Sequence, residues 1–404
     1  MKILFVTPRL PFPPDRGDRL RYFNFARSLS IHHSLSLVSL IQTEEEFKYI
    51  EELKSIFDHV ETVLLDPWKS NLNMAIHFFS KMPLQVFKFH SEKMQKKINE
   101  ITNREKFDAI YAFHFRTAHY LKRIKGTYKI LDSMDGIGLF LRRMLPKVNI
   151  YLKPIILREW VATKEYESKV LKEFDECWFI STVDKNSVKG TSARCNIHIV
   201  PNGIDTDYFR PERIGRDSSN LLFVGYMGIE SIDAILFFYN NIFPSIREEV
   251  PTARFYIVGK DPPRKIIELV EDGNITVTGY VEDLRPYYNS AAVLVAPLRF
   301  VVGLQNKVLE AMAMKVPVVT TSLGNEGIFA KYGESIFVED HPREFAQRVV
   351  ELLRDKELRD RIGTNARDFV KERFSWSQVV QRMDVLSKDL RKMNSNVRQT
   401  SYTR

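Results

Sequence analysis

Residues 293–321, VLVAPLRFVVGLQNKVLEAMAMKVPVVTT, decide the fold of this 404-residue chain. Two short apolar runs, 293–298 and 316–321, enclose a stretch in which apolar residues recur at helical spacing. Continuous apolar runs of this length are typical of strands buried on both faces of a parallel sheet. Parallel neighbours need a crossover connection, which is usually a helix. The stretch therefore predicts one βαβ unit of a doubly wound α/β sheet.

The same alternation extends outward from this unit in both directions. Amphipathic segments such as 44–57 and 157–174 predict helices between the strands. An alternation of strands and helices from end to end predicts an α/β protein with parallel sheets. We expect the other strands at residues 2–7, 34–40, 60–65, 108–113, 128–132, 177–181, 197–203, 221–226, 254–259, 275–280 and 335–340.

The length of the chain predicts two domains, because 404 residues exceed what one ordinary core organises. Residues 201–220 contain prolines, glycines and a Ser-Ser-Asn run, which is typical of a linker. We therefore predict one Rossmann-like domain over 1–200 and a second over 201–375. A helix with an apolar stripe over 376–393 and a polar tail over 394–404 follow.

The net charge of +9 lies entirely in the first half, which holds 32 Lys and Arg against 23 Asp and Glu. A basic half can bind nucleic acid, an anionic membrane or phosphorylated substrates. The chain has no helix-turn-helix, zinc-finger or RNP-type motif, so we expect no nucleic acid partner. Residues 68–97 carry six lysines and one acid, Glu92. This stretch either docks on an anionic membrane surface or forms ordinary amphipathic helices with a solvated lysine face.

The sequence also indicates in which cellular compartment we expect the protein. No apolar run approaches the about 18–20 residues of a membrane span, and the start, MKILFVT, is too short for a secretory signal. Cys177 and Cys195 are too few for a disulfide framework or a cysteine metal site. We expect a reduced cytoplasmic protein, which the membrane interpretation of residues 68–97 would place on the inner face of the cell membrane.

The loop and helix inside the opening stretch predict an anion site. Ligands of open α/β sheets bind beyond the carboxyl ends of the strands. Gly303 frees the backbone where the helix is expected to begin. Backbone N–H groups in a first helical turn have no partner in the helix, and with the helix dipole they attract anions. The groups that we expect in this turn belong to Leu304, Gln305 and Asn306.

Two charged residues follow in the same helix. Lys307 adds a positive charge to the anion site, and Glu310 lies on the same helical face. A carboxylate at that place can accept hydrogen bonds from the two hydroxyls of a ribose. The pattern thus indicates a site for the phosphate and sugar of a nucleotide. An ordinary helical ion pair between Lys307 and Glu310 is the alternative.

Several segments of the chain resemble glycosyltransferase family 4, whose members are retaining transferases of the GT-B fold. The segments are NKVLEAMAMKVPVVTT (306–321), VPNGIDTDYFRP (200–211), LLFVGYM (221–227), VTGYVEDLRPYYNSA (277–291) and TPRLPFPPDRGDRLR (7–21). In detail they are most similar to sugar transferases associated with bacterial exopolysaccharide and exosortase systems. The resemblance implies two Rossmann-like domains facing across a cleft and a last helix, 376–393, that crosses back to the first domain.

The resemblance also implies a reaction. A sugar, in the hexosyltransferase class, would pass with retention from a nucleotide-diphosphate donor to a saccharide acceptor, which we expect to be lipid-linked, in exopolysaccharide or cell-surface glycan synthesis. No cofactor and no metal are expected. Asp205-x-Asp207 could mimic a metal-binding DxD motif, but it lies in the linker after Pro-Asn-Gly. A nonhydrolysing sugar-nucleotide epimerase of the same fold and a catalytically silent nucleotide-sugar-binding subunit are the alternatives.

In the second domain, the resemblance assigns Glu310 to the donor ribose and counts it among the catalytic residues. Members of the family usually carry a second glutamate eight positions earlier, where this chain has Val302. They also often carry an Arg and a Lys for the diphosphate after the strand that ends in FVG, and FVGYMGIESID has neither. Arg299 and Lys307 are then expected to neutralise the donor phosphates.

In the first domain, the resemblance places Gly17 against the donor phosphate and the transferred sugar, and it makes Asp135 the catalytic residue on the acceptor side. Arg16 and His114 are further acceptor-side candidates. Asp132 is expected to be a helix cap or a buried hydrogen-bonding residue. The alternatives are a rigid surface loop with solvated arginines around Arg16 and a purely structural His114.

Overall fold

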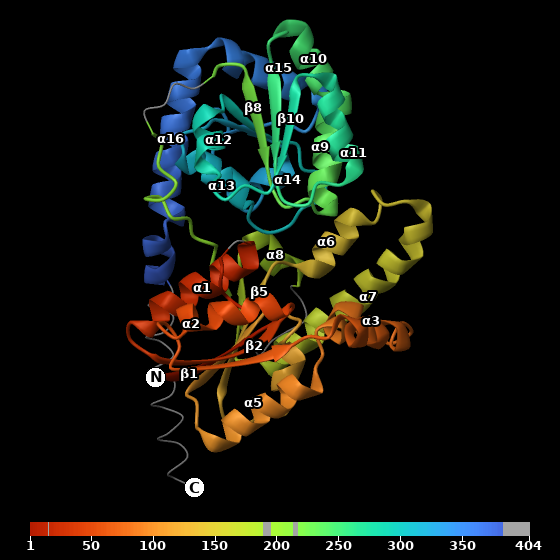
Figure 1. The fold of residues 1–404 in the computed structure, drawn as a ribbon, viewed down its shortest axis with the longest axis vertical. Helices are drawn as coiled ribbons and strands as arrows, with labels where there is room; N and C mark the ends of the chain where they lie inside the picture. Colours follow the sequence, from red (N-terminus) through yellow and green to blue (C-terminus); the bar gives the residue numbers. More distant parts are fainter. Residues whose placement is uncertain (15, 189–194, 213–216, 383–404) are drawn as a thin grey trace. The chain divides into compact units, whose positions relative to one another are not determined.

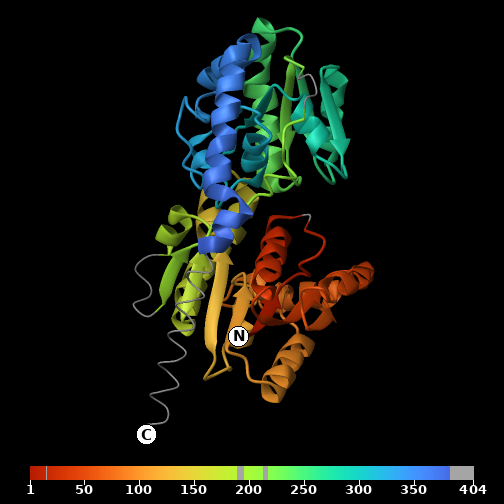
Figure 2. The same cartoon turned by 90° about the vertical axis from the view of Figure 1, so that its left-hand side faces the viewer.

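The computed structural model describes residues 1–14, 16–188, 195–212 and 217–382. The chain divides into two compact units (Figures 1 and 2). Unit 1 comprises Met1–Pro201 and the segment that begins at Val380, and unit 2 comprises Asn202–Val379. Each unit is an α/β layer structure around its own parallel sheet.

The sheet of unit 1 has the strand order β3-β2-β1-β4-β5-β6-β7, and every neighbouring pair is parallel. Its central strands are buried along nearly their whole length, as expected for apolar runs covered by helices on both faces. The strands are β1 (Lys2–Thr7), β2 (Ser34–Ile41), β3 (His59–Leu64), β4 (Ala109–Phe113), β5 (Tyr128–Met134), β6 (Glu176–Phe179) and β7 (Asn196–Ile199).

The helices of unit 1 include a pair, α6 and α7, that forms a helical hairpin (Figure 1). The α-helices are α1 (Gly17–Ser30), α2 (Ile50–Leu53), α3 (Pro67–Ile76), α4 (Leu84–Lys88), α5 (Glu92–Arg104), α6 (Ile137–Met144), α7 (Lys153–Val170) and α8 (Thr182–Ser187). Short 3₁₀ helices are η1 (Glu44–Tyr49), η2 (Ala118–Leu121), η3 (Ile150–Leu152) and η4 (Leu171–Glu173).

The sheet of unit 2 has the order β10-β9-β8-β11-β12-β13 and is also parallel throughout. Its strands are β8 (Asn220–Val224), β9 (Arg254–Val258), β10 (Ile275–Gly279), β11 (Val293–Ala296), β12 (Val318–Thr320) and β13 (Phe337–Val338). Its helices are α9 (Ile229–Asn241), α10 (Phe243–Glu249), α11 (Arg264–Ile267), η5 (Glu268–Asp272), α12 (Arg285–Ser290), α13 (Asn306–Ala313), α14 (Ser322–Asn325), α15 (Pro342–Arg354) and α16 (Lys356–Phe374). Figure 2 shows α16 as one long helix along this unit.

The predicted fold class, two doubly wound parallel sheets, is confirmed in both units. In each sheet the strand order reverses at one point, between β1 and β4 in unit 1 and between β8 and β11 in unit 2. Loops that leave the carboxyl ends of strands at such a switch point border the crevice where ligands of these folds bind. We therefore expect a ligand site at the loops that follow these four strands.

The predicted helix over 44–57 is wrong, because this segment forms η1 followed by the single turn of α2. The carboxylate of Glu46 reaches back to the backbone N–H of Gln42, at 2.8 Å, and to the guanidinium of Arg19. These tertiary bonds hold the segment in a tighter 3₁₀ turn, which overrides its helical periodicity.

The sequence predicts that the second domain ends at residue 375 and that a separate helix over 376–393 follows. The helix α16 ends at Phe374, and Ser375 forms an isolated parallel bridge with Ile204. Residues 376–382 are helical again. The rest of the predicted helix 376–393 and the tail 394–404 lie outside the described residues, so their crossing to the first domain stays a prediction.

Candidate functional site

The helix α13 begins two residues later than predicted, at Asn306 and not at Leu304. Its first residue is Asn306 and its N-cap is Gln305, whose carbonyl accepts the N–H groups of Val308 and Leu309. Leu304 precedes the helix, so its N–H does not belong to the first turn. Within the described chain, the helical N–H groups without a backbone acceptor at this end are those of Asn306 and Lys307. The predicted anion site therefore shifts toward the helix itself.

Gly303 turns the chain into this helix with a φ of 71°, in the left-handed region that favours glycine. A Cβ atom on Gly327 would lie 2.5 Å from the carbonyl oxygen of Gly303, so the two backbones are in direct contact. The side chain of Gln305 donates to the carbonyl of Val302 at 3.0 Å. These contacts fix the loop from Val302 to Gln305 ahead of α13.

Glu310 sits on α13 in a half-buried position with one of its carboxylate oxygens already bonded. The hydroxyl of Tyr288, a fully buried residue of α12, donates to Oε2 of Glu310 at 2.7 Å. Burial raises the pKa of Glu310, while the Tyr288 hydroxyl and the Lys307 amine act in the opposite direction. The contact orients the carboxylate and occupies Oε2, so Oε1 remains as an acceptor for another donor.

Lys307 does not pair with Glu310, so the alternative of an ordinary helical ion pair is not observed. Within the described residues, the amine of Lys307 makes no hydrogen bond or ion pair, and it lies 5.0 Å from the centre of the Phe223 ring at the end of β8. Burial lowers the pKa of Lys307, and Glu230 and Glu310 act against this shift. The side chain thus reaches from α13 to the loop after β8, across the switch point of the sheet.

Arg299 is placed differently from what its predicted phosphate role requires. Its guanidinium forms a two-pronged ion pair with Asp233 of α9, at 2.8 Å from Nε and 2.5 Å from Nη2, and it stacks on the Phe237 ring. A bidentate pair of this kind fixes the arginine. In this arrangement Arg299 braces the loop after β11 against α9, whereas the amine of Lys307 has no ion-pair partner among the described residues and could meet a phosphate.

In unit 1, Asp132 ends up in a fully buried ion pair with Arg21 of α1. Its Oδ2 accepts from Nε of Arg21 at 2.7 Å, and both side chains are 0% exposed. Burial raises the pKa of Asp132, while the Arg21 guanidinium acts to lower it. The prediction of a buried hydrogen-bonding residue is confirmed, and this aspartate ties α1 to the centre of the sheet.

Asp135 follows β5 and is half-buried next to a small group of acids. Burial raises the pKa of Asp135, and Asp184 raises it further. Asp184 accepts the N–H of Gly136 at 2.9 Å, and Glu167 of α7 accepts the N–H groups of Ile137 and Gly138 at 3.0–3.3 Å. The two acids therefore cap the start of α6 and position the loop that carries Asp135.

The remaining predicted residues of unit 1 lie around the loops after β1 and β4. Gly17 is the first residue of α1 and Arg16 is its N-cap, with Nε of Arg16 3.8 Å from Asp18. His114 is buried directly after β4 with a φ of 67°, and its Nδ1 accepts the N–H of Arg116 at 3.4 Å. Burial lowers the pKa of His114 well below its usual value. A neutral, buried His114 fits a positioning role at this switch point.

Several residues that position the sites were not foreseen from the sequence. They are the hydrogen-bond and ion-pair partners Tyr288, Asp233, Glu167 and Asp184. Tyr288 lies within one of the quoted motifs, and its buried hydroxyl needs an acceptor, so a search for partners of Glu310 could have included it. The other three carry no local sequence signal, because their partners lie between 29 and 66 residues away.

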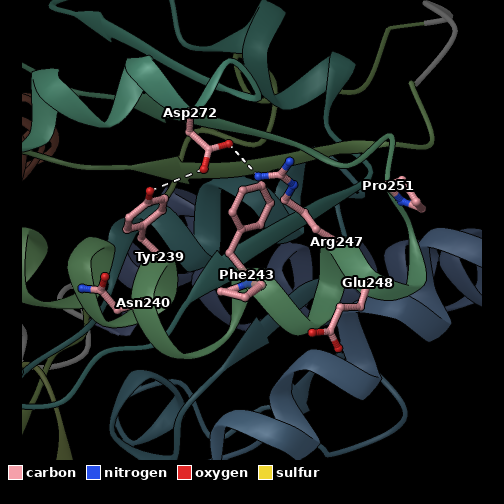
Figure 3. Close-up of a pocket in the computed structure, with 8 residues that line it drawn as sticks. Tyr239, Asn240, Phe243, Arg247, Glu248, Pro251 and Asp272 are labelled. Atoms are coloured by element: carbon pink, nitrogen blue, oxygen red, sulfur yellow. Dashed lines mark hydrogen bonds and ion pairs between the residues drawn. The ribbon is translucent and has the colours of Figure 1, made fainter.

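A pocket elsewhere in unit 2 does not involve the predicted site residues. Figure 3 shows Asp272 between Tyr239 and Arg247, with an ion pair of 2.7 Å to the arginine. The pocket lies over α9 and α10 and is lined by Tyr239, Asn240, Phe243, Pro244, Arg247, Glu248, Pro251 and Asp272. The Arg247–Asp272 pair joins α10 to η5, so we interpret these residues as structural.

The DxD-like pair in the linker has a local structural explanation. Oδ1 of Asp205 accepts the backbone N–H groups of Asp207 and Tyr208 at 3.0 and 2.8 Å, which is an Asx turn. In the described part of the chain, no group of three or more His, Cys, Asp or Glu side chains is placed to hold a metal ion. No helix among the described residues is both long and apolar enough to pass through a bilayer.

Known proteins resemble this chain in both sequence and fold. Residues 218–355, about a third of the chain, match the family model described as glycosyl transferases group 1. An uncharacterized 44.6 kDa protein in the cps region of Klebsiella pneumoniae is 23% identical, over 94% of this chain and 97% of its own. The capsular polysaccharide biosynthesis glycosyltransferase CapM of Staphylococcus aureus is 22% identical, over 82% and 85%.

Two solved structures share the fold at low sequence identity. Sucrose-phosphate synthase from Thermosynechococcus elongatus superposes with a TM-score of 0.73 at 15% identity, over 97% of this chain and all of that one. Anabaena HepE in complex with UDP superposes with a TM-score of 0.65 at 13% identity, over 96% and all. Residues 218–355 thus resemble the group 1 glycosyltransferases, and the chain shares its fold with both solved structures.

Proposed function

We propose that this protein is a retaining, metal-independent glycosyltransferase that moves a sugar from a nucleotide-diphosphate donor to a saccharide acceptor. Its product would be a capsular or related cell-surface polysaccharide, and its acceptor a lipid-linked saccharide. The donor would lie at the switch point of unit 2, and unit 1 would supply the acceptor side.

The observation that carries this proposal is the burial and the hydrogen bonding of the Glu310 carboxylate. A half-buried carboxylate whose orientation is fixed by a buried tyrosine, and which still has a free oxygen, is suited to accept hydrogen bonds from sugar hydroxyls. The Tyr288 hydroxyl already bonds to Oε2, so we assign Oε1 to the ribose of the donor. A structural ion pair would instead have brought the carboxylate to Lys307.

The neighbouring charge supports a diphosphate next to that ribose. The amine of Lys307 lacks an acidic partner among the described residues, and the first N–H groups of α13 lie in the same turn. Burial of such groups strengthens their interaction with negative charge. As the bond between the anomeric carbon and the phosphate oxygen breaks, negative charge grows on the phosphate, and these preorganised groups would stabilise it.

The acceptor step is assigned to unit 1. The acceptor oxygen would form the new bond to the anomeric carbon on the face that the phosphate leaves, and its proton would pass to the departing phosphate oxygen. Asp135, held by the capped loop after β5, would orient the acceptor hydroxyl. Arg16 and His114 are the further acceptor-side candidates, and Gly17 is expected near the donor phosphate.

The relatives support the biological setting of the proposal. One is named for capsular polysaccharide biosynthesis, and another is encoded in a cps region. A GDP-mannose-dependent mannosyltransferase of Mycobacterium tuberculosis is 26% identical over 46% of this chain and 54% of its own. Because HepE was solved with UDP and this relative uses GDP-mannose, both UDP- and GDP-sugars belong in the first substrate panel.

The test is an incubation of the full chain with a panel of nucleotide sugars, with and without a lipid-linked saccharide acceptor. Release of nucleoside diphosphate that depends on the acceptor is the expected result. Conversion of the nucleotide sugar to an epimer without an acceptor would identify an epimerase instead. Tight nucleotide binding with neither outcome would identify a silent binding subunit.

A further inference from the structure

We propose that two patches of unit 1, one on α3 and one at the tip of the α6–α7 hairpin, dock this protein on an anionic lipid bilayer. The inference goes beyond the proposed transfer reaction and does not depend on it, because it concerns only surface chemistry. It extends the membrane interpretation of residues 68–97 to a second segment of the chain.

The first patch, the α3 patch, consists of Trp68, Leu72, Ile76 and Phe79. Trp68, Leu72 and Ile76 follow one another at intervals of four, so they share one face of α3. The exposed fractions of Trp68 and Phe79 are 85% and 95%, which are extreme for large apolar side chains. A cluster of such residues on one helix and the turn that follows it marks an interaction site rather than scattered surface.

The second patch, the hairpin patch, consists of Ile150, Tyr151, Leu152 and Ile155. It covers η3 and the start of α7, at the turn of the helical hairpin in Figure 1. Tyr151 is 84% exposed and Ile150 is 65% exposed. Glu167 of α7 accepts the first N–H groups of α6 and so joins the two helices at the base of the hairpin. The apolar tip is therefore carried by two helices that are bonded to each other.

The two patches belong to one body. The guanidinium of Arg158 on α7 donates to the carbonyls of Ser80 and Met82, at 2.5 and 3.0 Å, just after the α3 patch. The neighbouring Glu159 accepts the N–H of Leu84 at 3.1 Å. The segment that follows α3 is therefore bonded to the helix that carries the hairpin patch.

The positive charge around both patches favours an anionic lipid surface as the binding partner. Residues 67–91 and 136–158 contain eight Lys and Arg, namely Lys69, Lys81, Lys88, Arg142, Arg143, Lys147, Lys153 and Arg158, and no Asp or Glu. Lys69, Lys81 and Lys147 are exposed, and none of them forms an ion pair within the described residues. Exposed aromatic and aliphatic side chains near lysines such as these three fit the interface of an anionic bilayer, where apolar groups enter the headgroup layer and lysines meet the lipid phosphates.

Vesicle co-sedimentation of the full chain tests the proposal. Vesicles of phosphatidylglycerol and phosphatidylcholine should bind the protein at least about tenfold more tightly than vesicles of phosphatidylcholine alone. Raising the salt from about 0.05 M to about 0.5 M should weaken this binding, because the shorter screening length removes the lysine contribution. The assay contains no nucleotide sugar, so its result is independent of whether the transfer reaction is correct.

Substitutions in each patch locate the contact. W68S combined with F79S, and I150S combined with Y151S, should each lower vesicle affinity about tenfold or more while leaving the melting temperature unchanged, because these side chains are exposed. The matched control is I267S combined with V270S, which removes two half-exposed apolar residues of unit 2. A control variant that loses as much binding would overturn the proposal.

Two other outcomes would overturn the proposal, and a third would overturn it for the hairpin patch. Equal binding to anionic and neutral vesicles would show that the basic surroundings play no part. Absence of vesicle binding, together with a dimer in sedimentation velocity that the patch variants dissociate, would assign the patches to a second copy of the chain. Retention of binding by the hairpin variant alone would remove the hairpin patch from the contact.

Discussion

Glu310 is the residue for which the structure makes the sharpest prediction. Replacement by alanine in E310A removes the oriented carboxylate that would accept the ribose hydroxyls, so nucleoside diphosphate binding should weaken by ~1.5–3 kcal/mol. Isothermal titration calorimetry measures this loss. In the comparison variant Y288F the carboxylate remains and only its orienting hydroxyl is lost, so a smaller loss is expected. Unchanged affinity of a folded E310A protein would exclude the ribose role.

Lys307 should act on the diphosphate rather than on the nucleoside. K307A is expected to weaken binding of nucleoside diphosphate more than binding of nucleoside, because only the former carries the charge that the amine would meet. R299A is the matched control, since Arg299 is held by Asp233 and should discriminate less between the two ligands. Equal losses for both ligands in K307A would show that this amine does not contact the phosphates.

The single residues of the site could be predicted from the sequence only in part. Lys307 and Glu310 follow from their place at the start of a helix after a strand, and the resemblance to known transferases supplies a role. Their environment could not be predicted, because Tyr288 meets Glu310 from 22 residues away and Asp233 meets Arg299 from 66 residues away. The latter contact changes the expected role of Arg299, and no spacing rule contains it.

Among the structural elements, the loop before α13 depends on a contact between two glycines. G327A would place a Cβ atom about 2.5 Å from the carbonyl of Gly303, so the loop must move. We expect a loss of stability of ~1–3 kcal/mol and weaker nucleotide binding, since the loop leads into Lys307. G273A is the comparison variant, because a Cβ atom on Gly273 would meet open space and any strain would come from its positive φ of 77°, not from a contact. Thermal unfolding and calorimetry compare the two, and nucleotide affinity lost equally in both variants would contradict the role of the loop.

The stability of the protein should depend on pH through Glu167, which caps the start of α6. Burial raises the pKa of this carboxyl to about 8 from 4.5, despite the N–H groups of Gly138 and Ile137. The folded protein then binds more protons than the unfolded chain between these values, so the contribution of Glu167 is full below pH 4.5 and is lost as the pH rises toward 8. One such proton corresponds to a slope of up to ~1.4 kcal/mol per pH unit.

The variant E167Q tests this slope, because the amide keeps an acceptor oxygen for the helix start and cannot ionise. Its stability relative to the natural chain should therefore increase between pH 5 and pH 8 by an amount set by that slope, about 1 kcal/mol or more. Denaturant unfolding at several pH values measures the difference. The exposed Glu165 on the same helix provides the control variant E165Q. A stability difference that does not change with pH would contradict the raised pKa.

Strands were more predictable than helices at this scale. Every strand of both sheets lies within or beside a predicted apolar run, because burial on both faces of a parallel sheet leaves a continuous signal. The segment 44–57 has helical periodicity, yet Glu46 bonds to Gln42 and Arg19 and holds it in a 3₁₀ turn. The first residue of α13 was also missed, since the side chain of Gln305 makes no capping hydrogen bond to the helix that would mark it.

For the whole molecule, the two separate cores predict that damage to one unit spares the ligand site of the other. D132N removes the carboxylate charge that pairs with the buried guanidinium of Arg21, which should destabilise unit 1 by ~3–5 kcal/mol. Hydrogen exchange should quicken in β1, β4 and β5 and stay unchanged in β8 to β12, and nucleotide affinity should persist. The double variant R21M with D132L should recover much of the stability, because apolar side chains replace both members of the buried ion pair. Equal exchange changes in both sheets would contradict separate cores.

The division of the chain was partly visible in its sequence, because the second run of strands starts after a segment rich in proline and glycine. In the structure the first boundary between the two units along the chain falls between Pro201 and Asn202. The return of the chain to Ile204 at Ser375 was not foreseen, since such a bridge joins residues far apart in sequence. The predicted helix over 376–393 lies largely outside the described residues and remains a prediction.

The most direct test of the central claim is the release of nucleoside diphosphate from the donor sugar that the panel identifies, measured with the natural chain and with E310A. We predict release that requires the saccharide acceptor, that yields a glycosylated product, and that falls at least about tenfold in E310A at subsaturating donor. Full activity of a folded E310A protein, or turnover of the nucleotide sugar that never transfers its sugar to any acceptor, would contradict the account.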